Sequence, residues 1–163
     1  MKRAITFLLF TLFVMSMSAY DFKSGNFYYN ITSSNTVEVT CQIAGNSDNY
    51  WLLTFAIIPE TVIYEGNTYS VTSIGDEAFH DCWSLVSINI PNSIQSIGRA
   101  AFYGCSSLYT TYVEATTPPM LSDNVFEETP ICYIPCGTLE AYEASGWTQY
   151  VGEFEEECEE KYT

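Results

Sequence analysis

Basic residues and histidine are scarce in this chain. Its 163 residues include five Lys and Arg residues against 20 Asp and Glu residues, and one histidine, His80. A surface with so few cations repels phosphate groups, which excludes nucleic acid partners and electrostatic docking to anionic membranes. A Ser-His-acid or Cys-His site needs an oriented histidine, and His80 lies in a repeated turn where the next copy has Tyr103. We therefore interpret His80 as a surface residue.

Metal and cofactor motifs are missing as well. Cys82 lies two residues from His80, but the acids nearby do not supply the ligand set of a zinc site. There is no glycine loop of the P-loop or dinucleotide-binding kind. The acidic run over 153–160 lacks the spaced ligands of a calcium loop, and we interpret it as a solvated terminus. The sequence predicts no metal and no cofactor.

The first 19 residues have the layout of a secretory signal peptide. Lys2 and Arg3 precede an apolar run over 4–15, and small residues follow at Ser16, Ser18 and Ala19. A membrane-spanning helix needs about 20 apolar residues, and this run is shorter. We expect export with cleavage, a location outside the cell or at its surface, and no membrane insertion afterwards. The remaining chain carries three bases against 20 acids, a formal charge of −17.

All six cysteines follow the predicted signal peptide, where an oxidising compartment permits disulfides. Cys82 and Cys105 occupy the same place in successive repeats, and we favour two buried thiols there. Cys132 and Cys136 lie in a segment predicted to be extended, which would separate their Cα atoms by about 13 Å, so they cannot bond to each other. The spacing leaves the remaining pairing open.

One internal repeat dominates the sequence. The segment SVTSIGDEAFHDCWSL over 70–85 returns 23 residues later as SIQSIGRAAFYGCSSL over 93–108. Agreement at many positions with a fixed offset is typical of a solenoid, whose units bury their apolar faces by stacking. Residues 86–90 alternate between apolar and polar, which predicts a half-buried strand. Phe79 and Phe102 begin short helical turns and are expected to form a ladder in the stack.

The flanking segments predict other elements. Residues 26–43 read as two strands joined by a Ser-Ser-Asn turn, and residues 50–58 as a largely buried strand. The sequence YEGNTY over 64–69 predicts a small projecting hairpin. Residues 137–147 are amphipathic and predict a terminal helix with Leu139, Tyr142 and Trp147 facing inward.

The repeated residues resemble the BspA-type leucine-rich repeat. The resemblance rests on Ser73-Ile74-Gly75, Ala78-Phe79, Cys82 and Leu85, which recur over 96–108, and covers roughly residues 57–150. The ending IPCGTLEAYEASGW resembles the terminal cap of short secreted Bacteroides-like members. Ser93 stands where the better-known leucine-rich consensus has Asn, so no asparagine ladder is expected.

This resemblance implies an α/β fold, a short leucine-rich-repeat solenoid with a parallel β-sheet and short helical turns. The hairpin read over 26–43 is expected to form an N-terminal β-hairpin cap, and the terminal segment a C-terminal helical cap. The expected segments are a signal peptide (1–19), an N-terminal β cap (20–56), repeats (57–126), and a C-terminal cap with an acidic tail (127–163). The family implies no catalytic residues.

The candidate binding residues follow from aligning the predicted strand ends. Asn89, Tyr112 and Tyr133 fall in one outward row with Ile57, and Ser87 and Thr110 lie beside it. Exposed aromatic side chains on a rigid sheet make good contacts, although Tyr112 and Tyr133 can instead stack on each other or lie under the N-terminal hairpin. Trp83 and Tyr103, on the turn near the repeated Cys, form a second exposed pair that can equally pack between coils.

The sequence therefore predicts an exported, non-enzymatic protein that acts by protein recognition or adhesion, with a host or bacterial surface protein as partner. Two alternatives remain open. One is a secreted carbohydrate hydrolase, which a clustered carboxylate pair in a pocket would favour. The other is a structural component of a surface assembly. The oligomeric state is left open.

Overall fold

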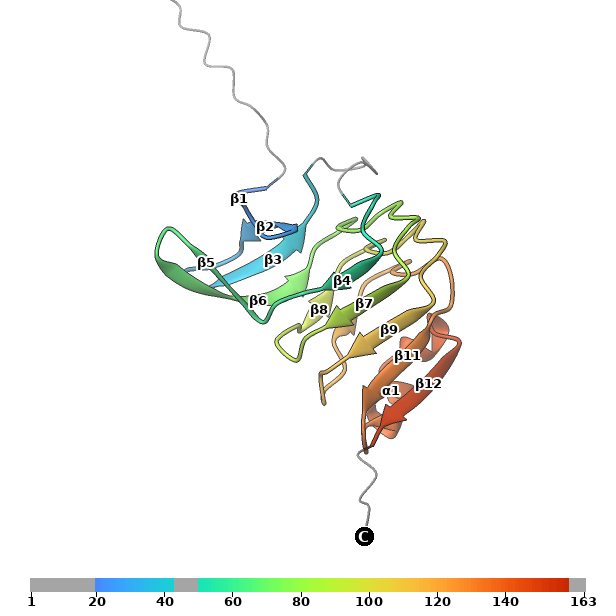
Figure 1. Ribbon diagram of the computed structural model, residues 1–163. Coiled ribbons are helices and arrows are strands. Elements are labelled where there is room, and N and C mark those ends of the chain that lie inside the picture. The colour runs from blue at the N-terminus through green and yellow to red at the C-terminus, as the bar shows by residue number, and fades with distance from the viewer. Residues whose placement is uncertain (1–19, 43–49, 159–163) are drawn as a thin grey trace, which may run out of the picture.

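The repeated positions fold into stacked coils that wind between two sheets (Figure 1). The computed structural model describes residues 20–42 and 50–158. In three successive coils the chain forms a strand in one sheet and then returns through a strand in the other. The apolar side chains between the sheets form one continuous core.

The repeat sheet is the sheet that carries the predicted repeat strands. Its order is β12-β11-β9-β7-β4, and every neighbouring pair is parallel. Along β7 the buried Ile88 and Ile90 alternate with partly exposed residues, because successive side chains of a strand point to opposite faces. The parallel solenoid sheet expected from the repeat is thus observed. Its strands are β4 (Phe55–Ile57), β7 (Ser87–Ile90), β9 (Thr110–Val113), β11 (Ile131–Pro135) and β12 (Glu153–Glu157).

The second sheet closes the other side of the coils and was not predicted. Its parallel part pairs Ser73 with Ser96, and Ser96 with Met120. Two of its strands contain only two residues, too short for a period to be visible in the sequence. Its strands are β1 (Phe22–Ser24), β2 (Phe27–Ile31), β3 (Thr36–Thr40), β5 (Thr61–Tyr64), β6 (Asn67–Ile74), β8 (Ser96–Ile97) and β10 (Met120–Leu121).

Three antiparallel strand pairs enlarge the second sheet near the N-terminus. Strand β1 pairs with β2 and β2 pairs with β3, and β3 pairs in parallel with β6, so the β2–β3 hairpin continues the sheet. Strands β5 and β6 form a further hairpin. Its turn places Glu65 at φ 49° and Gly66 at φ 80°, the left-handed backbone that tight hairpin turns require.

An aromatic stack runs through the centre of the coils. The rings of Phe79 and Phe102 lie 5.2 Å apart and those of Phe102 and Phe126 5.1 Å apart, with interplanar angles of 13° and 10°. Tyr50 extends the stack at one end and Trp147 at the other. The ladder predicted for Phe79 and Phe102 is therefore present and longer than predicted.

Two predictions near these rings are wrong. Within residues 50–58 only β4 is a strand. Tyr50 turns inward, where its hydroxyl donates to the Thr40 carbonyl and accepts from the Tyr28 N–H, and this turn leaves Leu52 exposed. The segments that start at Phe79 and Phe102 are hydrogen-bonded turns rather than helical turns, because the backbone N–H groups there also donate to the neighbouring coil.

The chain after β11 forms a helix and then one more strand of the repeat sheet. Helix α1 (Leu139–Ala144) ends before Gly146 at φ 85°, and a short 3-10 helix, η2 (Trp147–Gln149), follows. The interpretation of the acidic run as a solvated terminus is wrong for residues 153–157, which form β12. Phe154 explains the difference, because its ring faces inward and lies 5.9 Å from that of Tyr142.

A disulfide joins the ends of the last two strands. Cys136 follows β11, Cys158 follows β12, and their Cα atoms are 4.8 Å apart. Cys41, Cys82, Cys105 and Cys132 are buried free thiols, as favoured for Cys82 and Cys105. The Cys105 thiol lies 3.1 Å from the Phe79 carbonyl oxygen of the adjacent coil. A hydrogen bond with Cys82 and then burial raise the pKa of the Cys105 thiol far above its usual range.

Candidate functional site

The outer face of the repeat sheet carries side chains in straight rows across the strands. Residues at equivalent positions of neighbouring strands lie side by side, because the strands run in parallel about 4.8 Å apart. The central row is Ile57, Asn89, Tyr112, Tyr133 and Glu155. The adjacent row is Phe55, Ser87, Thr110, Ile131 and Glu153. The alignment of Asn89, Tyr112 and Tyr133, with Ser87 and Thr110 beside them, is thus the one that the sequence predicts.

Tyr112 and Tyr133 lie in the central row on the side that ends at Glu155. Their rings stack with centroids 4.8 Å apart and an interplanar angle of 15°, and both side chains are partly exposed. Desolvation raises the pKa of Tyr133, and Tyr112, Glu155, Tyr109 and Glu153 raise it further. Tyr112 and Tyr133 therefore do stack on each other, as one of the alternatives predicted. Both side chains nevertheless remain partly exposed to solvent. The N-terminal hairpin belongs to the second sheet (Figure 1).

The outer face changes character from one edge to the other. At the β4 edge, Phe55 and Ile57 are 66% and 71% exposed and make the face apolar. In the middle, the Asn89 amide donates to the Glu114 carboxylate over 3.0 Å. At the β12 edge, the exposed outward residues are Glu153 and Glu155, followed by Glu157. From β4 to β12 the outer face is therefore first apolar, then aromatic, and finally acidic.

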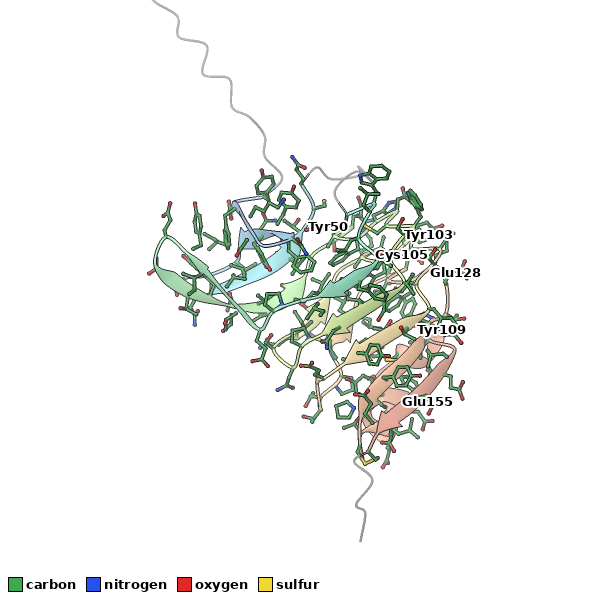
Figure 2. All side chains as sticks on the ribbon, viewed as in Figure 1. Tyr50, Tyr103, Cys105, Tyr109, Glu128 and Glu155 are labelled. Atoms are coloured by element: carbon green, nitrogen blue, oxygen red, sulfur yellow. A yellow bond between two sulfur atoms is a disulfide. The ribbon has the colours of Figure 1, made fainter. Side chains whose placement is uncertain are left out.

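Trp83 and Tyr103 lie away from this face, on the turns that connect the two sheets. Trp83 is 50% exposed and its ring lies 6.2 Å from that of Trp51. Tyr103 is 40% exposed and stacks on His80 at 5.7 Å. Figure 2 labels Tyr103 on this turn edge and Glu155 over the last strand. The structure therefore divides the seven candidate residues into a sheet group and a turn-edge pair.

His80 is partly buried rather than a plain surface residue. Its Nδ1 atom lies 3.1 Å from the Asp81 carboxylate, and its ring lies under Tyr103. The thiol of the nearby Cys82 faces the His80 carbonyl oxygen at 3.9 Å, so it is not directed at the imidazole as a nucleophile would be.

A polar groove of about 470 Å³ on the second sheet contains two carboxylates, Glu38 and Asp76. The Asn30 amide donates to Glu38 over 2.9 Å, and the Arg99 backbone N–H donates to Asp76 over 2.8 Å. Both carboxylates therefore link neighbouring segments of the chain. In residues 20–42 and 50–158 no group of three or more His, Cys, Asp or Glu side chains is arranged to hold a metal ion.

Sequence reasoning missed the acidic residues of β12 as members of the outer face. A run rich in Glu predicts an exposed segment without regular structure, so its composition gives no indication that it forms β12. One signal was available: Tyr133 and Glu155 are 22 residues apart, as are Cys136 and Cys158. This spacing is close to the repeat length and indicates one further coil after β11.

Bacterial leucine-rich-repeat proteins are among the solved structures that resemble this chain. A leucine-rich repeat protein from Bacteroides capillosus is 24% identical with a TM-score of 0.59, and the match covers 84% of this chain and 98% of that chain. A leucine rich cell surface protein from Faecalibacterium prausnitzii is 23% identical with a TM-score of 0.48, covering 75% of this chain and 34% of that one. A leucine-rich repeat protein from Bacteroides ovatus is 18% identical with a TM-score of 0.45, covering 83% and 53%.

The first of these structures supports the solenoid fold, since its TM-score exceeds 0.5 and nearly its whole length is matched. No curated protein matches the chain. No helix among the described residues is long and apolar enough to cross a membrane. The family model for the BspA type leucine rich repeat region matches residues 53–140, more than half of the sequence. The chain belongs to the BspA-type leucine-rich-repeat family.

Proposed function

We propose that this chain is an exported, non-enzymatic protein that recognises a protein partner outside the cell or at its surface. The proposed contact surface is the outer face of the repeat sheet. Its proposed contact residues are Ser87, Asn89, Thr110, Tyr112 and Tyr133. Trp83 and Tyr103 on the turn edge form a second contact area in this proposal.

The single observation that carries the proposal is the stacked pair of Tyr112 and Tyr133 on a partly exposed, five-stranded face. Tyrosine supplies a large contact area with few rotatable bonds, so a partner can bury it at a low cost in side-chain entropy. The parallel strands below are hydrogen-bonded across the whole sheet and hold the pair in place. Family membership supports recognition rather than catalysis, because leucine-rich-repeat domains typically bind proteins.

The test is affinity capture with the exported chain as bait and surface proteins of host or bacterial cells as prey. The Tyr112→Ala/Tyr133→Ala variant is expected to retain its fold and to lose about tenfold or more of its affinity for the captured partner, as removal of aromatic anchors does. Binding of the purified partner to each bait is measured by surface plasmon resonance.

The second proposed contact area is tested by Trp83→Ala/Tyr103→Ala, which removes two aromatic rings from the turn edge instead. A larger loss in this variant would move the main contact area to the turn edge. If both double variants bind the same partner as well as the unmodified chain does, the proposal for the sheet face is wrong. Circular dichroism of each variant separates lost binding from lost folding.

The proposed segments are a signal peptide over 1–19, an N-terminal β cap over 20–56, repeats over 57–126, and a C-terminal cap with the acidic residues over 127–163. The signal peptide lies outside the described residues. The N-terminal hairpin and α1 are proposed as the caps, because a stack of few coils has two apolar ends to cover. Amino-terminal sequencing of the exported protein tests the cleavage, which is expected before Ala19 or Tyr20.

A further inference from the structure

We propose that the acidic side of the outer face binds an arginine-rich, extended segment of the partner protein. The acidic side is formed by Glu153, Glu155 and Glu157 on β12 together with the adjacent Tyr112 and Tyr133. The inference rests on the proposed function, because it assigns a partner chemistry to one part of the same face.

The three glutamates lie on the outer side of β12. Residues 153, 155 and 157 alternate along β12 and so point to one side of the sheet. The ring of Phe154 packs near Tyr142 on the inner side, which fixes the three glutamates on the outer side. Glu155 is the register partner of Tyr133, and Glu153 that of Ile131. Carboxylates and stacked tyrosine rings are therefore direct neighbours.

The charge of these glutamates is not compensated by an ion pair within the described part of the chain. The ion pairs found there involve His80 and Arg99, and none includes a residue of β12. Arg99 follows β8 of the second sheet, and Lys23 lies on β1 over the Tyr28 ring. Like charges on one side of a strand repel one another, so a cation from outside relieves this repulsion as it binds.

The same side of the face combines carboxylates with aromatic rings. The planar guanidinium of arginine stacks on tyrosine rings and also donates two parallel hydrogen bonds to a carboxylate. Lysine offers only a compact ammonium charge. An extended segment with arginine at every second position repeats its side chains at the same spacing as the outward residues of β12. An arginine-rich strand therefore fits both the chemistry and the spacing.

The test uses a labelled synthetic peptide in which arginine alternates with serine, and a lysine analogue of the same length. Fluorescence anisotropy at physiological ionic strength measures the Kd for the folded protein. We expect the arginine peptide to bind more tightly than the lysine peptide. The Glu153→Gln/Glu155→Gln/Glu157→Gln variant should weaken arginine-peptide binding by about tenfold, the sum expected for three exposed charge pairs.

The matched control removes the same charge elsewhere. Glu128, Glu140 and Glu143 are exposed and lie outside the repeat sheet, so the triple glutamine variant there is expected to change the Kd less than about twofold. Tyr112→Phe/Tyr133→Phe should keep the preference for arginine, because phenylalanine retains the aromatic face, and the double alanine variant should lose it.

Three results would overturn the inference: no binding of the arginine peptide, equal loss in both triple glutamine variants, or equal affinity for the lysine peptide. None of these results changes the outcome of the affinity-capture experiment that tests the proposed function. A partner whose binding depends on Tyr112 and Tyr133 but not on the β12 glutamates would leave the proposed function standing and refute the arginine-rich segment.

Discussion

Phe102 is the central residue of the aromatic stack that fills the coils. It is 1% exposed and has Phe79 on one side and Phe126 on the other. Phe102→Ala removes a ring from both contacts and leaves a cavity that the stacked coils cannot close. We expect the free energy of unfolding to fall by about 3–5 kcal/mol. Urea unfolding followed by circular dichroism measures the change.

The adjacent Tyr103 supplies the control for this prediction. Tyr103 is 40% exposed, so Tyr103→Ala is expected to change the free energy of unfolding by about 1 kcal/mol or less. If the two variants unfold at the same urea concentration, the stack contributes no more than a surface contact, and our account of the core is wrong.

At the scale of elements, Glu156 connects the last strand to the helix before it. Its carboxylate Oε1 accepts the backbone N–H groups of Gly137, Thr138 and Leu139 over 2.8, 3.0 and 3.1 Å. These donors have no partner inside α1, and a negative charge at this end is stabilised by the helix dipole. Glu156→Ala is therefore expected to lower the free energy of unfolding by about 1–2 kcal/mol, measured by urea unfolding.

Glu155 provides a matched control, because it is the next residue and points to the other side of β12. Glu155→Ala should leave stability within about 0.5 kcal/mol and weaken arginine-peptide binding, while Glu156→Ala should do the reverse. The same loss of stability in both variants would contradict the assignment of Glu156 as the residue that satisfies the start of α1.

The elements that the sequence predicted are those with a period long enough to read. The strand over 87–90 alternates polar and apolar residues, and the fixed repeat aligned its Asn89 with Tyr112 in the strand over 110–113. The two-residue strands β8 and β10 have no readable period. In the coil that contains β10, Leu121 lies 24 residues after its register partner Ile97, so this coil is one residue longer than the repeat.

The part of the candidate site that follows from the register of the repeat strands was predictable from the sequence. The part that lies on β12, in the last coil, was not. Tyr112 and Tyr133 were placed correctly because each precedes the apolar residue near the end of its strand, as Asn89 precedes Ile90. Glu155 was missed because four of the five residues of β12 are Glu, and the 22-residue spacing from Tyr133 is one residue shorter than the repeat. The Cys136–Cys158 bond depends on the same pairing, so its assignment requires the further coil to be recognised first.

At the scale of the whole molecule, the ends of the stack determine how the fold holds together. An end strand has a neighbour on one side only, and β12 is an end strand whose outward residues repel one another. Besides the pairing with β11 and the packing of Phe154, β12 is held by the bonds from Glu156 to the start of α1 and by the disulfide at its C-terminal end. The covalent link should therefore matter more here than in the middle of the stack.

Reduction of the Cys136–Cys158 disulfide tests this view. The bond closes a loop of 22 residues that contains α1 and β12. Loop closure of this size is worth about 3 kcal/mol in the chain-entropy account, so reduction should lower the midpoint of urea unfolding. Because β12 has one neighbouring strand, its amide protons should exchange faster after reduction while those of β7 and β9 stay protected.

The Cys136→Ser/Cys158→Ser variant separates this effect from other actions of the reductant. The described chain has its remaining cysteines as free thiols, so the double serine variant should unfold at the same urea concentration with and without dithiothreitol. It should also match the reduced unmodified protein, because both lack the same crosslink. An unmodified protein whose β12 exchanges equally slowly in both redox states would show that side-chain packing, led by Phe154 against Tyr142, is sufficient to hold the last strand.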